Sequence, residues 1–217
     1  MSFVQKLPFS YHWILNNILS QDIVTVLDVG CGTGSLMHDL SRGKNWIITG
    51  VDIYPDSVNK ANATGIYHKT YLSDITSLPT EITQNKYDLV FCSQVIEHLP
   101  KEAALSLISQ CEALASRQCL ISTIVGFNNF SPLESESEKE NPYQEHKSAW
   151  HPHEFHQRGF RTYGQGFFLI YKEGYLAYRL PKYFLPLLYG IGYLLAPIPY
   201  FFTMLGNQQI AIKNISN

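Results

Sequence analysis

The chain has 217 residues, of which 45% are hydrophobic, enough for one α/β domain with a substantial core. Its formal charge of -2 and pI near 6.4 give no general attraction for nucleic acid, so a nucleic-acid partner is not expected. The four cysteines form no C-x-x-C pair, which favours reduced thiols in a cytoplasmic protein.

The chain begins with the stretch MSFVQKLPFSYHWILNNILSQ. It lacks a charged region followed by a clean apolar core and a small-residue cleavage site. It therefore predicts a short amphipathic helix rather than a signal peptide.

Apolar strands and amphipathic helices alternate from residue 23 to residue 125. Runs of β-branched and other apolar residues predict strands at 23–29, 46–53, 87–93 and 119–125, with a weaker one at 66–72. Helices are expected between them at 35–42, 55–63 and 101–116. This alternation predicts a mainly parallel sheet that binds ligands beyond the carboxyl ends of its strands.

Three glycines follow the first expected strand in the sequence VLDVGCGTGSL. Gly30, Gly32 and Gly34 permit a sharp turn and a close approach of a ligand to the backbone, and the next helix adds free N–H groups. The dinucleotide fingerprint requires its third glycine one position later, where Ser35 stands. Asp52 ends the second strand and is placed to accept hydrogen bonds from two ribose hydroxyls. Together these residues predict a ligand site.

The stretches VLDVGCGTGSL, VDIYPDSV, LSDITSLP and YDLVFCSQVIEHLP resemble, in that order, the motifs of the class I S-adenosylmethionine-dependent methyltransferases of type 11/12. The resemblance covers roughly residues 22–125. It implies a Rossmann-like α/β fold with a mainly parallel seven-stranded sheet and helices on both faces. It also implies the cofactor S-adenosylmethionine, the product S-adenosylhomocysteine, and methyl transfer to an oxygen or nitrogen atom.

The resemblance assigns a role to each matched residue of the first two motifs. The loop Gly30–Gly34, which includes Cys31, would face the methionine part of the cofactor, and Asp28 would organise that loop. Asp52 would hold the ribose, and Ile53 would pack on the adenine.

The later motifs complete the implied cofactor site. Asp74 would accept a hydrogen bond from the adenine amino group, and Ile75 would offer its backbone N–H. Gln94 would lie near the sulfonium. For Asp74 the alternative is a helix N-cap, because Ser73 and Asp74 precede the sequence TSL.

His98 and His146 are the expected catalytic residues. The fold must hold the acceptor, methyl and sulfur in line, and an oxygen or nitrogen acceptor also needs a proton removed, for which histidine is the usual choice. His98 follows the fourth strand, and His146 lies after the fifth strand, where such folds bind the acceptor. The alternative for His98 is that, with Glu97, it only closes the cofactor pocket.

A weaker resemblance concerns metal binding. Gln94-x-x-Glu97-His98, followed by His146-Lys-x-x-Trp150, is similar to the metal-binding pattern of the small-RNA 2′-O-methyltransferases, which use two glutamates and two histidines. Gln94 is a poor ligand for a hard divalent ion, and phosphate contacts need a basic surface. We therefore expect no metal. A metal-assisted RNA methyltransferase and a non-catalytic cofactor-binding module remain the alternatives.

No charged residue lies between Tyr183 and Ile212. This length could cross a bilayer, but Pro186, Pro197 and Pro199 would break a single helix. Strands expected at 167–171 and 208–213 flank the segment, and a return to the sheet excludes a single span. We expect residues 183–205 to form an apolar helical cap, which covers the acceptor pocket, packs on the core or in a dimer, or contacts a membrane peripherally.

The organisation that follows is a single methyltransferase domain, 1–217. It comprises a cofactor-binding core at 22–125, an acceptor-side segment at 126–165 and the apolar helical cap at 172–206. The acidic loop at 131–140 is expected to be solvated, and the helix that follows it should stop at Gly159. The expected acceptor is a small or lipid-like molecule; its identity and the oligomeric state are left open.

Overall fold

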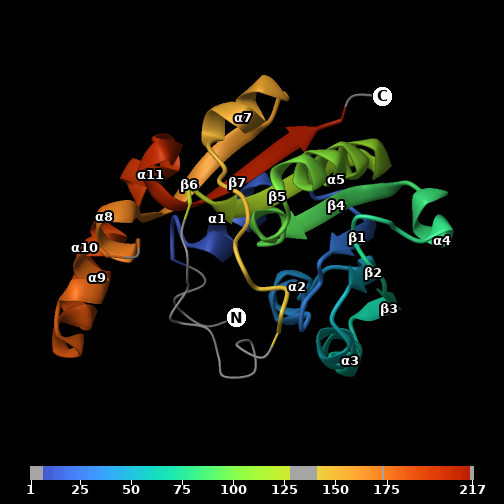
Figure 1. Ribbon diagram of the computed structural model, residues 1–217, viewed down its shortest axis with the longest axis horizontal. Helices are drawn as coiled ribbons and strands as arrows, with labels where there is room; N and C mark the ends of the chain where they lie inside the picture. The colour runs from blue at the N-terminus through green and yellow to red at the C-terminus, as the bar shows by residue number, and fades with distance from the viewer. Residues whose placement is uncertain (1–6, 128–140, 173, 216–217) are drawn as a thin grey trace.

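The computed structural model describes residues 7–127, 141–172 and 174–215. Its centre is a seven-stranded sheet with the strand order β3-β2-β1-β4-β5-β7-β6 (Figure 1). The strands that run parallel to one another are β1 (Thr25–Val29), β2 (Ile47–Asp52), β3 (Tyr67–Leu72), β4 (Tyr87–Ser93) and β5 (Ala115–Ile124). β7 (Gly206–Asn214) is antiparallel to both β5 and β6 (Arg161–Phe167). The expected Rossmann-like α/β fold with a mainly parallel sheet is confirmed.

Helices cover both faces of the sheet. α1 (Tyr11–Ile18) and α2 (Ser35–Leu40) pack on one face, and α5 (Lys101–Leu114) and α7 (Pro152–Gln157) pack on the other. α3 (Pro55–Ala63) and α4 (Thr80–Thr83) complete the core connections, with the short 3-10 helix η2 (Ile96–His98) after β4. Strand residues alternate between the two layers: Leu89 and Phe91 pack toward α1, and Val90 and Cys92 pack toward α5.

The strand register brings the ends of three strands together at one edge of the sheet. Val29 at the end of β1 is paired with Val51 on β2 and with Cys92 on β4, so the three strands finish side by side. The strand order also reverses between β1 and β4, which is the point where ligands bind in such sheets. The residues that follow these strands are therefore brought together.

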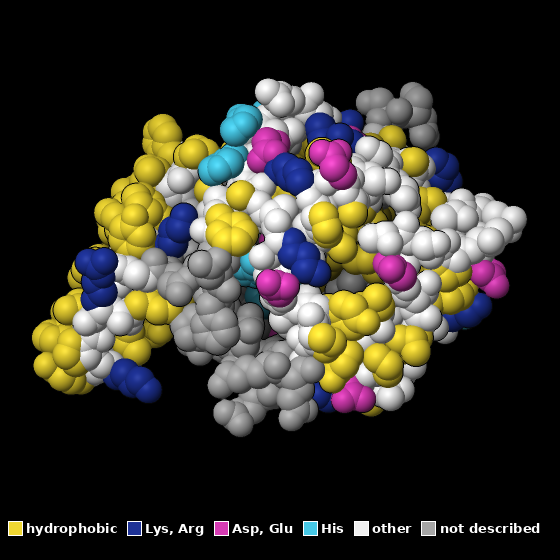
Figure 2. Space-filling model, viewed as in Figure 1, with side chains coloured by type: hydrophobic (Ala, Val, Ile, Leu, Met, Phe, Trp, Pro, Cys, Tyr) yellow, Lys and Arg dark blue, Asp and Glu magenta, His cyan; other side chains and the backbone are white. Residues whose placement is uncertain are grey.

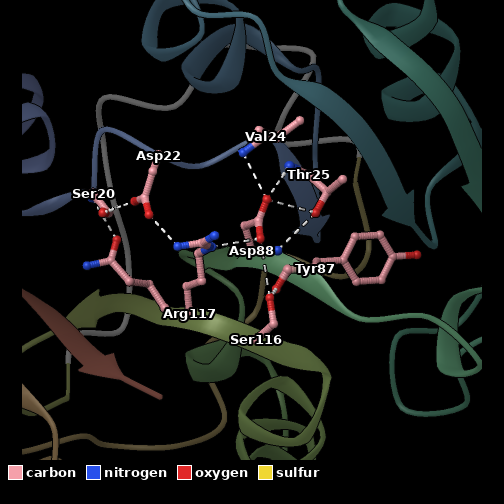
Figure 3. Close-up of polar contacts among 9 residues, drawn as sticks. Ser20, Asp22, Val24, Thr25, Tyr87, Asp88, Ser116 and Arg117 are labelled. Atoms are coloured by element: carbon pink, nitrogen blue, oxygen red, sulfur yellow. Dashed lines mark hydrogen bonds and ion pairs between the residues drawn. The ribbon is translucent and has the colours of Figure 1, made fainter. Parts of the chain in front are cut away.

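A polar network fixes the opposite edge, where the strands begin (Figure 3). The Asp88 carboxylate accepts hydrogen bonds from the backbone N–H groups of Val24 and Thr25, both at 2.9 Å, and from Arg117 at 3.1 Å. Arg117 also pairs with Asp22. Burial opposes ionisation of Asp88, but these hydrogen bonds outweigh it and hold its pKa below the usual value. The network ties the starts of β1, β4 and β5 to the chain that follows α1.

The sequence assigned residues 167–171 and residues 115–116 to the wrong kind of element. Residues 167–171 were expected to form a strand, and this prediction is wrong: β6 ends at Phe167 and residues Phe168–Tyr171 form the helix α8. A short apolar run fits a buried strand and a helix equally well. Residues 115–116, expected at the end of a helix, belong to β5.

The segment between β6 and β7 is helical, as expected. It contains α8, α9 (Leu176–Arg179), η3 (Lys182–Phe184), α10 (Leu185–Leu194), α11 (Pro197–Phe201) and η4 (Thr203–Leu205). Prolines stand in the first turns of α10 and α11, where a missing N–H costs little. Within the described residues, no helix has the length and apolar character needed to cross a membrane. α11 packs on β6, whereas α9 and α10 extend away from the sheet (Figure 1).

The remaining predictions for the segment after β5 have separate outcomes. The helix expected before Gly159 is present as α7, and Gly159 follows it with a φ of +83°. The acidic loop at 131–140 lies outside the described residues.

Candidate functional site

A cavity of about 790 Å³ opens at the edge where β1, β2 and β4 end. All of the predicted site residues line it: Asp28, Gly30, Cys31, Gly32, Gly34, Asp52, Ile53, Asp74, Ile75, Gln94, His98 and His146. They come from five stretches of the sequence that only the fold brings together. The structure thus supports a shared site, while the role of each residue stays a prediction.

The glycine loop adopts a backbone that side chains disfavour. Gly30, Gly32 and Gly34 have φ values of +70°, +53° and +75°. A Cβ on Gly30 would lie 2.3 Å from Val95 Cγ2, whereas no described atom lies within 4 Å of the Cβ position of Gly32. Gly30 therefore allows Val95 to pack closely against the loop. Gly32 leaves the backbone open toward the cavity.

Asp52 is held by the loop that it faces. Its Oδ2 accepts a hydrogen bond from the Gly32 N–H at 2.8 Å, and its Oδ1 accepts one from the Tyr54 N–H at 2.9 Å. A carboxylate oxygen has lone pairs for a second donor. The arrangement leaves Asp52 able to accept from two neighbouring hydroxyls, as a ribose presents them.

Asp28 supports the loop through an aromatic ring that the sequence did not reveal. Its Oδ2 accepts a hydrogen bond from the Tyr67 hydroxyl at 2.6 Å. The Tyr67 ring in turn lies 2.8 Å from the Cβ positions of Gly34 and Gly50, so a larger residue at either position would strike it. Burial raises the pKa of Asp28 to about 7. Tyr67 was missed because it comes from the weakest expected strand.

Asp74 and Ile75 lie at the wall beyond β3. Asp74 Oδ1 accepts hydrogen bonds from the backbone N–H and the hydroxyl of Thr76, both at 2.8 Å. The side chain thus caps a turn and not a helix, because no helix begins there. Ile75 is buried beside it. Recognition of an adenine by this pair stays a prediction.

His98 and His146 face one another on the other side of the cavity, with ring centroids 4.9 Å apart. The backbone N–H groups of Lys147 and Ser148 donate to the carbonyl of Glu97 at 2.7 and 3.1 Å, which fastens the His146 segment to η2. Burial, and then the neighbouring His146, lower the pKa of His98 to about 4. His98 Nδ1 lies 3.3 Å from the Glu145 carbonyl, a contact that favours a proton on Nδ1 and a lone pair on Nε2.

Glu97 is completely buried beneath the two histidines. Its Oε2 accepts a hydrogen bond from the Thr123 hydroxyl at 2.9 Å, and its Oε1 has no hydrogen-bond partner among the described residues. Burial raises the pKa of Glu97 to about 7. Glu97, His98 and His146 each offer a ligand atom, and these atoms lie within 4.8 Å of one another. This geometry is compatible with a divalent metal ion, although the sequence leads us to expect none.

Gln94, which lies between β4 and η2, adopts an uncommon backbone conformation. Its φ is +55°, which few residues other than glycine adopt, and its backbone N–H donates to the Ser122 carbonyl at 2.9 Å. Its side-chain Nε2 is buried without a hydrogen-bond partner in the described part of the chain. A strained, unsatisfied amide in a cavity is suited to a ligand that accepts a hydrogen bond.

Three hydroxyl groups beside the cavity were not predicted. Tyr11 Oη lies 2.6 Å from Ser122 Oγ and 2.9 Å from Ser93 Oγ, and the two serine oxygens are 2.8 Å apart. Ser93 lines the cavity, and burial raises the pKa of Tyr11 to about 12. The cluster anchors α1 to the ends of β4 and β5. A single tyrosine in an amphipathic N-terminal helix carries no signal for this contact.

The first strands of the sheet and the loops that follow them match a known protein family. The sequence profile of a methyltransferase domain family matches residues 26–117, which is less than half of the chain. These residues are thus similar to a methyltransferase domain, and we call them the methyltransferase core. The match spans the elements from β1 to the start of β5, and the methyltransferase core therefore contains the loop, Asp52, Asp74, Gln94 and His98.

Two curated relatives are similar to the methyltransferase core. The ubiquinone biosynthesis O-methyltransferase of Haemophilus ducreyi is 33% identical over 96 residues, covering 41% of this chain and 39% of that protein. The magnesium-protoporphyrin O-methyltransferase of Synechocystis is 33% identical over 99 residues, covering 45% of this chain and 43% of that protein. The chain thus spans about two fifths of the length of the curated relatives that it matches.

Solved structures share the fold around the methyltransferase core. The Synechocystis magnesium protoporphyrin IX methyltransferase, crystallised with bound SAH, has a TM-score of 0.55 and 19% identity, covering 94% of this chain and 79% of that one. The methyltransferase domain of bacterial CtHen1-CN has a TM-score of 0.55 and 16% identity, covering 94% of both chains. Both likenesses extend beyond the core to the last strands of the sheet.

Proposed function

We propose that the protein is an S-adenosylmethionine-dependent methyltransferase that transfers a methyl group to an oxygen atom of a small, lipid-like acceptor. One observation carries the proposal: a single cavity holds the glycine loop and Asp52 at one side and the His98–His146 pair at the other. The sequence relatives of the core are O-methyltransferases, which supports oxygen as the acceptor atom.

The residues of the cavity fit the cofactor. The open backbone at Gly32 accommodates a closely packed ligand, Asp52 can accept from the ribose hydroxyls, and Ile53 offers an apolar surface for the adenine. The buried amide of Gln94 can donate to the carboxylate end of the ligand or to the acceptor. When bound, S-adenosylmethionine supplies a methyl group on a sulfonium, which is a good leaving group.

In this proposal His98 accepts the proton that the acceptor hydroxyl loses. The ring is neutral at physiological pH, and the Glu145 carbonyl holds Nδ1–H, which directs the basic Nε2 away from the backbone. His146 positions the acceptor from the opposite side, because its segment is fixed to η2 by two backbone hydrogen bonds. The remaining contribution of the protein is alignment of the reacting atoms.

Transfer of a labelled methyl group to an apolar cell extract tests the two histidines. We expect His98→Ala to lower turnover by 10²- to 10⁴-fold, the usual range for a lost general base. His146→Ala should also lower turnover, because the acceptor is then less well positioned. The matched control is His68→Ala, since His68 is exposed on β3 and does not line the cavity. Full turnover by the double variant His98→Ala/His146→Ala would refute this assignment.

A second candidate is metal-assisted methyl transfer, with a ribose hydroxyl of RNA as one acceptor. The specific observation that favours it is the buried Glu97 Oε1, which lacks a hydrogen-bond partner among the described residues and belongs to the three-ligand group. Here the three side chains would hold a divalent ion that takes the acceptor oxygen as a ligand.

Calorimetric titration with Mn²⁺ in the absence of any substrate separates the two candidates. Micromolar binding that Glu97→Gln abolishes would support the metal. No heat with wild-type protein, together with turnover in a chelator, would leave the metal-free reaction. Binding of S-adenosylhomocysteine without turnover on any extract would instead support the non-catalytic module.

The proposed location is the cytoplasm, with peripheral membrane contact through residues 183–205. What supports this contact is the exposure of large apolar side chains in that segment.

A further inference from the structure

The helices between β6 and β7 expose an unusual amount of apolar surface. We call residues 175–204 the apolar arm. Its most exposed large side chains, each more than half accessible, are Tyr183, Leu187, Leu194, Phe201, Phe202 and Met204. Figure 2 shows hydrophobic side chains gathered at the left end of the molecule, where Figure 1 places α9, α10 and α11. An apolar patch of this extent on a protein surface marks a contact site.

The sequence and exposure of α10 indicate that another apolar surface covers the arm. Its sequence LPLLYGIGYL is apolar on all sides, yet only Leu188 and Gly192 are buried, and Leu194 is 76% exposed. A helix that is apolar all round normally lies in a protein core or in a membrane. With ten residues it is about 15 Å long, half of the roughly 30 Å hydrocarbon thickness, so it suits shallow insertion and not a span.

The charges of the segment favour a lipid surface over a second copy of the chain. No Asp or Glu occurs from residue 174 to residue 217, and the charged residues of the arm are Arg179 and Lys182. A twofold contact between two arms would bring these cations together without an acidic residue of the arm to offset them. Anionic headgroups complement them, and the tyrosines of the arm suit the boundary between headgroups and acyl chains.

The arm is also joined to the wall of the cavity. Tyr171 stacks on Tyr189 of α10 with ring centroids 6.0 Å apart. Gly192 lies so close that a Cβ there would be 2.4 Å from Tyr171 Oη. Tyr171 and Tyr178 both line the cavity. The exposed apolar surface of the arm therefore continues into one wall of the cavity.

We propose that the apolar arm docks the protein on an anionic membrane surface and admits an acceptor dissolved in the lipid through the Tyr171–Tyr178 side of the cavity. The docking stands on the surface itself, and only the route of the acceptor rests on the proposed function.

Vesicle flotation tests the docking. Wild-type protein should float with vesicles of phosphatidylcholine containing phosphatidylglycerol, and Phe201→Ser/Phe202→Ser should lower the bound fraction by at least tenfold. The matched control is Val24→Ser/Ile47→Ser, which removes two half-exposed apolar side chains from the opposite edge of the sheet. It should bind as wild type does. Thermal unfolding and calorimetry with S-adenosylhomocysteine show that each variant is folded.

A second variant tests the charge argument. Arg179→Gln/Lys182→Gln should bind anionic vesicles on the order of tenfold more weakly and lose most of the salt dependence. It should bind pure phosphatidylcholine no differently from wild type. Equal loss on both kinds of vesicle would overturn the role of the anionic headgroups.

Other outcomes overturn the docking itself. The proposal fails if wild-type protein does not float, or if light scattering shows a dimer that Phe201→Ser/Phe202→Ser dissociates. Neither result touches the methyltransferase assignment, which fails separately if folded protein binds no S-adenosylhomocysteine.

Discussion

At the scale of single residues, Asp52 has two roles, and a single substitution would remove both. It accepts from the Gly32 N–H, which shapes the loop, and it faces the cavity where the ribose is proposed to lie. Asp52→Ala should weaken S-adenosylhomocysteine binding by about 2–3 kcal/mol, roughly 30- to 150-fold, because charge-assisted hydrogen bonds are lost. Isothermal calorimetry measures this. Asp56→Ala, which removes an exposed carboxylate outside the cavity, should bind normally; unchanged affinity in Asp52→Ala would contradict the assignment.

A comparison of Gly30 with Gly43 separates the energetic cost of a steric clash from the cost of backbone strain. An alanine at φ +70° costs about 1–2 kcal/mol, and its Cβ would also meet Val95 at 2.3 Å. Gly43 has a similar φ of +73° but no described atom within 4 Å of its Cβ position, so Gly43→Ala carries the strain alone. Thermal unfolding should therefore show Gly30→Ala to be clearly less stable than Gly43→Ala. Equal melting temperatures would mean that Val95 moves aside freely.

Asp28 predicts a pH dependence of stability with a definite sign. Its pKa is about 7 in the folded protein and near 3.9 in an unfolded chain. Between these values the folded state holds a proton that the unfolded state has released, so this contribution falls as the pH rises from about 4 to about 7. Asp28→Asn keeps an acceptor for Tyr67 and cannot titrate. Urea unfolding should show the wild-type free energy declining relative to the variant across this window; parallel profiles would exclude a raised pKa.

At the scale of elements, the sequence predicted those whose burial pattern is strong. The strand at 87–93 and the helix at 55–63 agree with the structure at both ends, because an apolar run and a leading proline mark their limits. The expected strand at 167–171 was wrong because its short apolar run fits a helix equally well, whereas the real strand β6 lies earlier and contains Gly164 and Gly166. A Cβ at Gly164 would lie 2.3 Å from the Pro199 carbonyl, so the strand needs glycine to let α11 approach. Such a requirement comes from a distant element and leaves no local pattern.

Two glycines of α10 test whether the apolar arm is coupled to the cavity. Gly192→Ala would push the Tyr171 ring, whereas no described atom lies within 4 Å of the Cβ position of Gly190. Gly190→Ala should raise the melting temperature slightly, because alanine favours a helix by about 1 kcal/mol. Gly192→Ala should lower it and reduce methyl transfer to an apolar acceptor. Equal behaviour of the two variants would show that Tyr171 does not link the arm to the cavity.

At the scale of the whole molecule, the predicted site residues share one cavity because parallel strands end at one edge. The motifs follow the strands in chain order, so the sequence alone predicted which residues after β1, β2 and β4 would lie together. Tyr171 and Tyr178 line the cavity from the helices before β7. Tyr11 of α1 and Tyr67 of β3 support its wall through hydrogen bonds to Ser93 and Asp28, and no motif marks these four tyrosines. The sequence also suggested a cap over the pocket, whereas α9 and α10 project outward with most side chains exposed.

The fate of the methyl group tests the central claim most directly. Purified protein is incubated with methyl-labelled S-adenosylmethionine and a whole-cell extract, which is then separated into lipid, small-molecule, RNA and protein fractions. The account predicts label in the lipid or apolar small-molecule fraction, as a base-stable ether, in the presence of a chelator. Label confined to RNA and dependent on Mn²⁺, or no label although S-adenosylhomocysteine binds, would contradict it.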